Sequence, residues 1–197
     1  MQQLVVVAGP NGTGKSSFVK AFKDEYGLTD FEYINPDIYA VKFFSDIVEE
    51  EARYHLAFEL AEYKCEEALK ENRNIIIETV NSTTRKFDFY RECKSKGYNI
   101  TVVYVCTNSY QININRVAKR KAQGGHDVPT EKIISRYQKS LDNMFELSLF
   151  ADVLYVYDNS NENGQPALCY YKDKNESKLV YEPKWVIEYF IKKLSEY

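Results

Sequence analysis

The chain has 197 residues and a mass of 23.0 kDa, which is the size of one ordinary domain. Hydrophobic residues make up 44% of it and charged residues 28%, which supports a buried core and excludes wholesale disorder. The net charge of −3 is unfavourable for a dedicated nucleic-acid binder. No apolar run approaches the roughly 18 residues of a membrane span, so we expect neither nucleic acid nor a membrane as a partner.

The four cysteines fit neither a zinc site nor a disulfide framework. They are Cys65, Cys93, Cys106 and Cys169, separated by 28, 13 and 63 residues, and we expect reduced thiols in the core. The first ten residues, MQQLVVVAGP, contain too few apolar residues for a signal peptide and lack its basic start. We therefore expect a soluble cytoplasmic protein.

Short apolar runs alternate with helical patterns along the chain. The runs predict strands at residues 4–9, 31–35, 74–80, 100–107 and 152–158. Several are apolar throughout, which is typical of parallel strands buried on both faces. The helical patterns lie near residues 15–25, 37–71 with a break around 44–45, 83–96, 109–122 and 130–148. This order predicts a doubly wound α/β domain, with a five-stranded, mostly parallel sheet and helices on both faces.

The pattern changes after Asp158. A polar turn, DNSNENGQP, is followed by two short apolar runs on either side of Asn175, which predict an antiparallel hairpin. The last residues, WVIEYFIKKLSEY, predict an amphipathic helix. We expect one domain over residues 1–197, with a core over 1–160 and a C-terminal hairpin and helix over 161–197.

A phosphate-binding loop follows the first predicted strand. GPNGTGKS matches the pattern G-x-x-x-x-G-K-[ST] at every fixed position. Its glycines let backbone N–H groups surround phosphates, Lys15 neutralises the β- and γ-phosphate oxygens, and the Ser16 hydroxyl is placed to bind Mg²⁺. The sequence therefore predicts a P-loop fold that binds ATP and Mg²⁺. The residues expected to hold the nucleotide are Gly9, Pro10, Asn11, Gly12, Thr13, Gly14, Lys15, Ser16 and Ser17.

Other P-loop classes lack support in the sequence. No N-K-x-D, which a GTPase needs to read guanine, occurs in the chain, and no L-S-G-G-Q-like ABC signature occurs either. Polar residues instead stand at or just beyond the ends of the predicted strands, where a parallel sheet opens onto the phosphate loop. We expect these residues, Asp37, Glu78, Thr107 and Asp158, to converge with Lys15, as in a small-molecule kinase.

Five segments together resemble the zeta toxin family of P-loop kinases, over roughly residues 4–160. They are AGPNGTGKSS, INPDIYA, ETVNS, RVAKRKAQGGHDVPTEKIISRY and VYDNS, in that order. The resemblance implies transfer of the ATP γ-phosphate to a small-molecule hydroxyl. In characterised toxins of the family the acceptor is UDP-N-acetylglucosamine, and a small helical antitoxin restrains the enzyme.

The resemblance assigns roles to four acidic or hydroxyl-bearing residues. Asp37 matches the catalytic carboxylate that activates the acceptor hydroxyl; from the residues alone, it could equally complement the dipole of the helix that it starts. Glu78 and Thr79 match the acceptor-binding E-T, and Ser82 belongs to the same stretch. For Glu78 the alternative is contact with Mg²⁺ through water.

The net charge conceals two charged stretches. Residues 45–72 contain nine acidic and three basic residues, and residues 113–139 contain seven basic and two acidic residues. Alone, the basic stretch is best explained as a solvated helix face. With the resemblance it becomes a lid in which Arg116 and Arg136 contact phosphates during catalysis and Arg120 contributes to binding ATP. We expect His126 to be structural, and the acidic stretch has no assigned role beyond a candidate protein interface.

Three functional hypotheses remain at this point. The first is a zeta-toxin-like kinase, acting on an acceptor such as a UDP-sugar and paired with an antitoxin. The second is a nucleotide or other metabolite kinase. The third is an ATP-binding switch or regulator with a protein partner and no acceptor.

Overall fold

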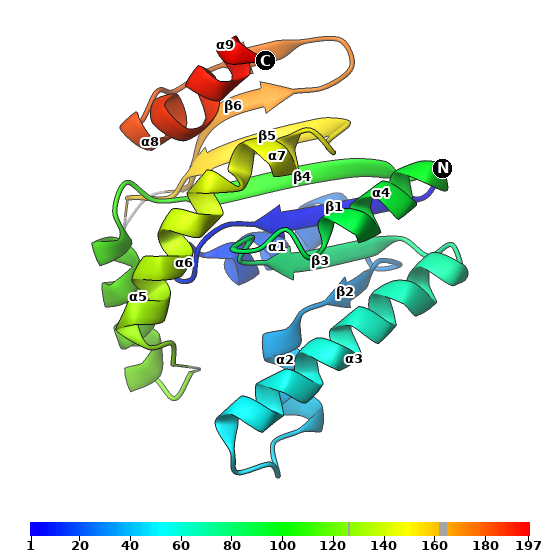
Figure 1. Ribbon diagram of the computed structural model, residues 1–197, viewed down its shortest axis with the longest axis vertical. Coiled ribbons are helices and arrows are strands. Elements are labelled where there is room, and N and C mark those ends of the chain that lie inside the picture. Colours follow the sequence, from blue (N-terminus) through cyan, green and yellow to red (C-terminus); the bar gives the residue numbers. More distant parts are fainter. Residues whose placement is uncertain (126, 162–164) are drawn as a thin grey trace.

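One mixed sheet organises the molecule. The computed structural model describes residues 1–125, 127–161 and 165–197, and in them the strand order is β2-β3-β1-β4-β5-β6-β7 (Figure 1). Five strands are parallel, as predicted from the sequence: β1 (Gln3–Ala8), β2 (Glu32–Ile34), β3 (Ile75–Thr79), β4 (Asn99–Cys106) and β5 (Val153–Asp158).

The predicted C-terminal hairpin forms, but it is not a separate unit. Its strands β6 (Ala167–Lys172) and β7 (Ser177–Leu179) extend the same sheet in antiparallel fashion beyond β5. The described sheet therefore has seven strands rather than the expected five. The apolar runs predict a hairpin but contain no information on which sheet edge it joins, so this pairing was not predicted.

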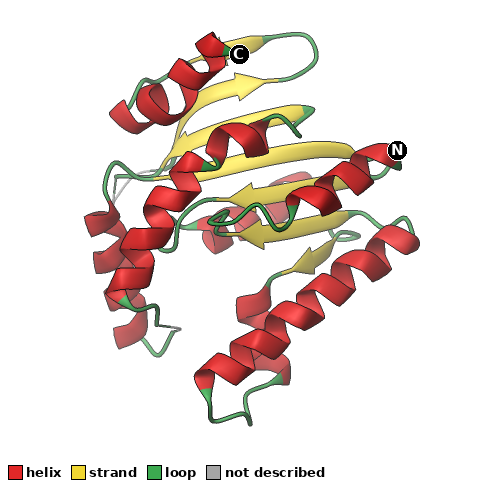
Figure 2. Cartoon of the chain, in the orientation of Figure 1, coloured by secondary structure: helices red, strands yellow, loops and turns green. Residues whose placement is uncertain are grey.

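Helices cover the two faces of the sheet unequally (Figure 2). Alternation along β1 sends Leu4 and Val6 to one core and Val5 and Val7 to the other. The second core is covered by α1 (Lys15–Tyr26). The larger first core is covered by α3 (Glu50–Lys70), α4 (Phe87–Ser95), α6 (Thr130–Asp142), α7 (Met144–Ser148) and a C-terminal helical segment made of α8 (Lys184–Val186), the π-turn η1 (Ile187–Ile191) and α9 (Lys192–Glu196).

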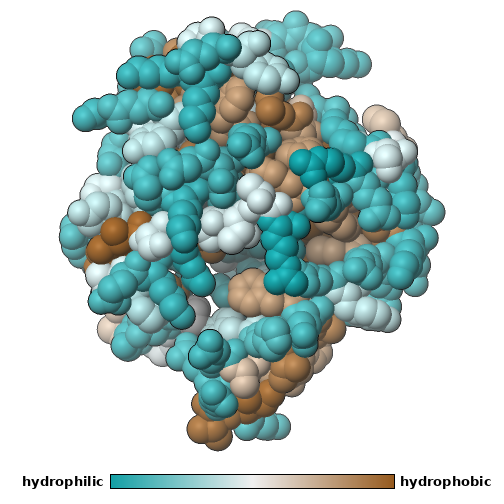
Figure 3. Space-filling view, in the orientation of Figure 1, coloured by the Kyte–Doolittle hydropathy of each residue, from teal (hydrophilic) through white to brown (hydrophobic). Residues whose placement is uncertain are grey.

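The acidic stretch forms part of an arm that projects from the sheet (Figure 1). Its first helix is α2 (Pro36–Phe43), which begins where the Asn35 side chain accepts a hydrogen bond from the Asp37 N–H, at 2.9 Å. A loop over residues 44–49 then leads into α3, near the predicted break. At the tip, Val41 is 67% and Val48 97% exposed, and Figure 3 shows hydrophobic side chains gathered there.

The basic stretch forms a second projection, the lid. It contains α5 (Tyr110–Ala122) and the first part of α6, joined around a small core of Val117, Val128 and Ile133. Gly124 between them has a φ of 82°, a left-handed conformation that favours glycine. His126 lies outside the described residues, so its expected structural role stays a prediction.

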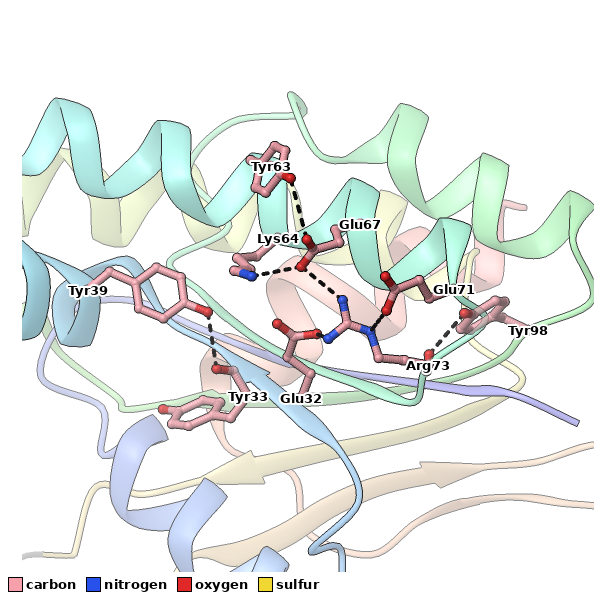
Figure 4. Close-up of polar contacts among 9 residues, drawn as sticks. All are labelled: Glu32, Tyr33, Tyr39, Tyr63, Lys64, Glu67, Glu71, Arg73 and Tyr98. Atoms are coloured by element: carbon pink, nitrogen blue, oxygen red, sulfur yellow. Dashed lines mark hydrogen bonds and ion pairs between the residues drawn. The ribbon is translucent and has the colours of Figure 1, made fainter.

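Arg73 joins the far end of α3 to the sheet (Figure 4). Its guanidinium contacts three carboxylates, those of Glu32 at 2.5 Å, Glu67 at 3.0 Å and Glu71 at 3.0 Å. The Tyr98 hydroxyl donates to the Arg73 carbonyl oxygen at 2.9 Å. The Arg73 side chain therefore connects the end of α3 to β2, and these ion pairs give part of the acidic stretch a structural role.

The cysteine expectation is confirmed: all four are buried free thiols. Burial raises the pKa of the Cys106 thiol to about 12, so this thiol is an unreactive core group. Among the described residues, no helix combines the length and the apolar character needed to cross a membrane.

Candidate nucleotide and acceptor site

The phosphate loop is shaped by close contact with later parts of the chain. Gly9 has a φ of 143°, and a Cβ there would lie 1.9 Å from the Val105 carbonyl oxygen on β4. A Cβ on Gly12 would lie 2.7 Å from the Asn113 carbonyl oxygen on α5. Both positions therefore require glycine for space as well as for backbone conformation.

Lys15 begins α1 with its ammonium group inside the loop. The side chain is 7% exposed, and Nζ donates to the Pro10 carbonyl oxygen at 2.9 Å. Burial lowers the Lys15 pKa, while the nearby charges of Glu78 and Asp37 raise it and that of Arg120 lowers it. A buried cation with one neutral partner is poised for phosphate oxygens, which would complete its hydrogen bonding.

The Glu78 carboxylate, at the end of β3, is held by three donors. Ser16 Oγ donates to Oε1 at 3.0 Å. Tyr33 OH donates to Oε2 at 2.6 Å, and Asn35 Nδ2 donates to the same oxygen at 2.9 Å. This arrangement places Glu78 beside the hydroxyl expected to bind Mg²⁺ and favours the metal-side alternative over the acceptor-binding one.

The residues at the phosphate loop fit the Mg²⁺ ion that the sequence predicts. Mg²⁺ in phosphoryl-transfer sites is usually held by one or two protein oxygens together with phosphate oxygens and water. Ser16 Oγ and the Glu78 carboxylate supply such oxygens at the loop. No cluster of three or more His, Cys, Asp or Glu side chains that could hold a metal alone occurs in the described part of the chain.

A cavity of about 360 Å³ opens between the phosphate loop, the arm and the lid. Its lining includes polar and charged side chains together with two aliphatic ones: Ser16, Asn35, Asp37, Ile38, Val41, Lys42 and Arg120. Asp37 comes from the first turn of α2, so the arm brings this carboxylate to the metal-side serine. The same cavity thus contains an acid, a cation and room for a small acceptor.

A second cavity, of about 590 Å³, lies on the opposite side of the phosphate loop. Arg116 donates to the Asn161 carbonyl oxygen there at 3.3 Å, and Asn159 Nδ2 donates to the Thr13 carbonyl oxygen in the loop at 2.8 Å. The Nη1 atom of Arg116 is buried without a hydrogen-bond partner among the described residues. Residues lining this cavity include Gly14, Ser17, Phe18, Tyr157, Gln165 and Pro166.

The three lid arginines occupy different places. Arg120 lines the smaller cavity with Asp37, whereas Arg116 lines the larger one. Arg136 is half-buried on α6 and lines neither of them. The geometry therefore favours Arg120, rather than Arg116, at the phosphoryl-transfer end, and the expected catalytic roles of Arg116 and Arg136 stay predictions.

Several other residues expected in the site form hydrogen bonds within the protein around it. The Thr79 hydroxyl accepts the Asn81 N–H at 3.2 Å, which stabilises the turn after β3, and Ser82 is half-buried in the loop that follows. Thr107 donates to Asn113 Oδ1 at 2.7 Å, at the start of α5. Asp158 accepts the indole N–H of Trp185 at 2.7 Å. Thr107 and Asp158 thus reach the expected sheet edge, but their side chains bond to protein groups rather than converging on Lys15.

Sequence reasoning missed Tyr33 and the amide of Asn159. Tyr33 precedes the Asn-Pro-Asp segment on β2, and burial beside Glu78 raises its pKa well above the usual range, so the phenol remains a donor. A tyrosine in a short apolar strand gives no signal of its own. Asn159 belongs to the D-N-S segment, and its position directly after a strand was the available signal.

Fold and site together define the class of protein. The first strand, the glycine loop and the buried Lys15 at the carboxyl edge of a parallel sheet are those of a P-loop nucleotide-binding fold. A model of the family described as Zeta toxin matches residues 2–175, so the chain belongs to the zeta toxin family.

Solved structures share this fold at low sequence identity. The AvrRxo1-ORF1:-ORF2 complex with ATP matches with 15% identity and a TM-score of 0.72, covering 91% of this chain and 60% of that chain. The PezAT chromosomal toxin-antitoxin system of Streptococcus pneumoniae matches with 16% identity and a TM-score of 0.65, covering 96% and 79%. Shikimate kinase from Bacteroides thetaiotaomicron matches with 16% identity and a TM-score of 0.50, covering 83% and 90%.

These likenesses concern the fold alone. The protein spans about 60% of the length of the AvrRxo1 chain that it matches. A search of curated protein sequences finds no match.

Proposed function

We propose that the protein transfers the γ-phosphate of ATP to a hydroxyl group of a small molecule, with residues 1–197 acting as one kinase unit. One observation carries the proposal: Asp37, Ser16 and Arg120 line a single cavity beside the phosphate loop, and the charges of Asp37, Glu78 and Arg120 all act on Lys15. A kinase needs this set, because the acceptor, the metal and the transferring phosphoryl group must meet at one point.

The residues divide the reaction between them. Asp37 accepts the proton of the acceptor hydroxyl as its oxygen bonds to the γ-phosphorus. The bond from that phosphorus to the β–γ bridging oxygen breaks, and ADP leaves with the electron pair. Lys15 and Arg120 offset the charge on the phosphate oxygens. Mg²⁺, when bound, neutralises phosphate charge, and Ser16 and Glu78 are the residues that would hold it.

The ATP base fits the larger cavity. Arg116 lines it, with an Nη1 atom that has no hydrogen-bond partner in the described part of the chain, and Asn159 fixes the wall of this cavity to the phosphate loop. Aromatic side chains of α1 and β5, Phe18 and Tyr157, line this cavity with 5.1 Å between their ring centres. A planar base has apolar surface to contact and polar groups at its edge.

The acceptor and the partner are the finer parts of the proposal. A UDP-sugar such as UDP-N-acetylglucosamine is the acceptor that family membership favours, and Lys42 and Arg120 in the smaller cavity suit an anionic diphosphate. A small antitoxin protein is the partner, because a family member of similar fold comes from a toxin-antitoxin system. Because ATP is the co-substrate and the thiols are reduced, we place the protein in the cytoplasm.

The test is phosphorylation of a metabolite extract and of purified UDP-sugars, with ATP and Mg²⁺, read by mass spectrometry. Asp37→Asn keeps the shape of the side chain and removes the base, so product formation should fall by about 10²–10⁴-fold while ATP still binds. Lys42→Gln is the matched variant on the same helix and should change acceptor KM rather than kcat. Full turnover by Asp37→Asn with an intact fold would refute the mechanism, and product on no tested hydroxyl would refute the function.

A further inference from the structure

The Asp158 carboxylate lies buried at the end of β5 between two donors. It is 6% exposed. One oxygen, Oδ2, accepts the Trp185 indole N–H at 2.7 Å, and the other, Oδ1, accepts the Ser160 N–H at 3.0 Å. A buried carboxylate needs such donors, and losing one of them leaves an unsatisfied charged oxygen.

The residues directly after Asp158 build one wall of the nucleotide cavity. Asn159 donates through its side chain to the Thr13 carbonyl oxygen in the phosphate loop, and its backbone N–H donates to the Cys106 carbonyl oxygen at 2.7 Å. Ser160 Oγ accepts the Asn108 N–H at 2.8 Å. The Asp158–Ser160 bond closes a side-chain turn of the Asx kind, so the Asp158 carboxylate sets the conformation in which Asn159 reaches the loop.

Trp185 comes from a different part of the chain. It lies on α8, beyond residues 2–175, to which the family model extends. The indole is 4% exposed and packs near the Tyr104 ring, with 6.1 Å between ring centres. An apolar ring of similar shape could fill this space, yet the N–H is directed at the carboxylate that shapes the turn.

We infer that Trp185 is a positioning residue for nucleotide binding: through Asp158 it fixes the turn at residues 159–161 against the phosphate loop. The C-terminal helical segment is thereby part of the machinery that binds ATP, although it contributes no residue to the nucleotide cavity. The inference rests on the proposed nucleotide site and does not depend on the acceptor.

The experiment measures binding of ATP and of ADP, with Mg²⁺ and without acceptor, by calorimetry. Trp185→Phe keeps most of the ring packing and removes the N–H, so Kd for both nucleotides should rise about tenfold, the loss of one hydrogen bond to a charged group. Phe190→Leu is the matched control, since Phe190 is buried in the same segment and packs on Tyr170. It should lower Tm and leave Kd unchanged.

A second variant keeps the indole in place. Asp158→Asn presents an N–H₂ group to one of the two donors, so it should also weaken nucleotide binding about tenfold, with acceptor KM unchanged. Trp185 is the only tryptophan in the chain, so a difference in its emission between the wild type and Asp158→Asn reports on this bond. Wild-type affinity in either Trp185→Phe or Asp158→Asn would overturn the inference, whereas a wild type that binds no nucleotide would refute the proposed function.

Discussion

Ser16 donates its hydroxyl to Glu78 at 3.0 Å, which joins the first turn of α1 to the end of β3 across 62 residues. Tyr33 and Asn35 hold the other carboxylate oxygen. The carboxylate is therefore oriented before any ligand arrives, with one oxygen bonded to the serine that is expected to bind Mg²⁺. Glu78 does not line that cavity, whereas Asp37 does.

Glu78→Gln should raise the Mg²⁺ concentration needed for half-maximal activity about tenfold, the usual effect of losing a group that orients a metal ligand. The amide also opposes the Tyr33 or Asn35 donor with its own N–H₂ group. The measurement is activity against Mg²⁺ at saturating acceptor, and Glu62→Gln on the surface of α3 is the control. An unchanged Mg²⁺ requirement with a raised acceptor KM would return Glu78 to the acceptor-binding role.

Lys15→Met should abolish ATP binding and raise the Tm of the nucleotide-free protein. Burial lowers the Lys15 pKa, so at neutral pH the folded protein holds an ammonium that water would solvate better. For a chain of this size, each kcal/mol recovered adds about 2–4 °C to Tm. Calorimetric melting of both proteins without nucleotide provides the measurement, and a lower Tm for Lys15→Met would contradict the assignment.

The same substitution makes a pH prediction. Below the folded-state pKa of Lys15, the wild type is destabilised by the full cost of burying the charged ammonium group. As pH rises from there towards the ordinary value of 10.5, the ammonium deprotonates in the fold and the penalty fades. The Tm difference between Lys15→Met and wild type should therefore shrink on the alkaline side, and a difference that grows with pH would contradict this sign.

Arg120→Ala and Arg116→Ala should affect different constants. Arg120 shares a cavity with Asp37, so its loss should lower kcat by about 10³-fold or more. Arg116 shares a cavity with Asn159, so its loss should chiefly raise the KM for ATP. Steady-state kinetics with ATP varied at fixed acceptor separates the two, and Lys119→Ala on the same helix is the control. If Arg116→Ala lowered kcat and Arg120→Ala raised the KM for ATP instead, Arg116 would be the arginine that contacts the transferring phosphoryl group.

Arg73→Met should reduce the free energy of unfolding by about 1–2 kcal/mol, because three ion pairs of 0.2–1 kcal/mol each are lost. Arg85→Ala removes one exposed pair, with Glu62, and should cost less than Arg73→Met.

The ion pairs of Arg73 also predict a pH dependence. Lys64 and Arg73 lower the Glu67 pKa below its ordinary 4.5, so the stability that they supply is present at neutral pH and lost as pH falls through that pKa. Urea unfolding at neutral and acid pH measures this: the free energies of unfolding of the wild type and Arg73→Met should become more alike in acid.

The sequence predicted the parts of the site that depend on local patterns. The phosphate loop has a fixed spacing, and the five parallel strands are short apolar runs. Partners separated by long stretches of chain could not be predicted. Glu78 meets Ser16 and Tyr33 because β3 lies between β1 and β2, and strand order is absent from any local pattern.

The C-terminal residues show the same limit. Their hairpin and helix were expected, but the joining of β6 to β5 and the Trp185–Asp158 bond depend on which sheet edge and which face they meet. Arg116 and Arg120 lie four residues apart on α5, a spacing that places two side chains on one face of a helix. Arg116 and Arg120 nevertheless line different cavities, because the phosphate loop lies between the two cavities.

The close contacts of the phosphate loop also bear on when the protein becomes active during synthesis. Gly9 rests against Val105, Gly12 against Asn113 and Thr13 against Asn159. The loop therefore has its binding shape only once the chain has emerged from the ribosome past residue 159, although its own sequence is made first. A nascent chain that ends before residue 159 should therefore bind ATP more weakly than a chain that includes it.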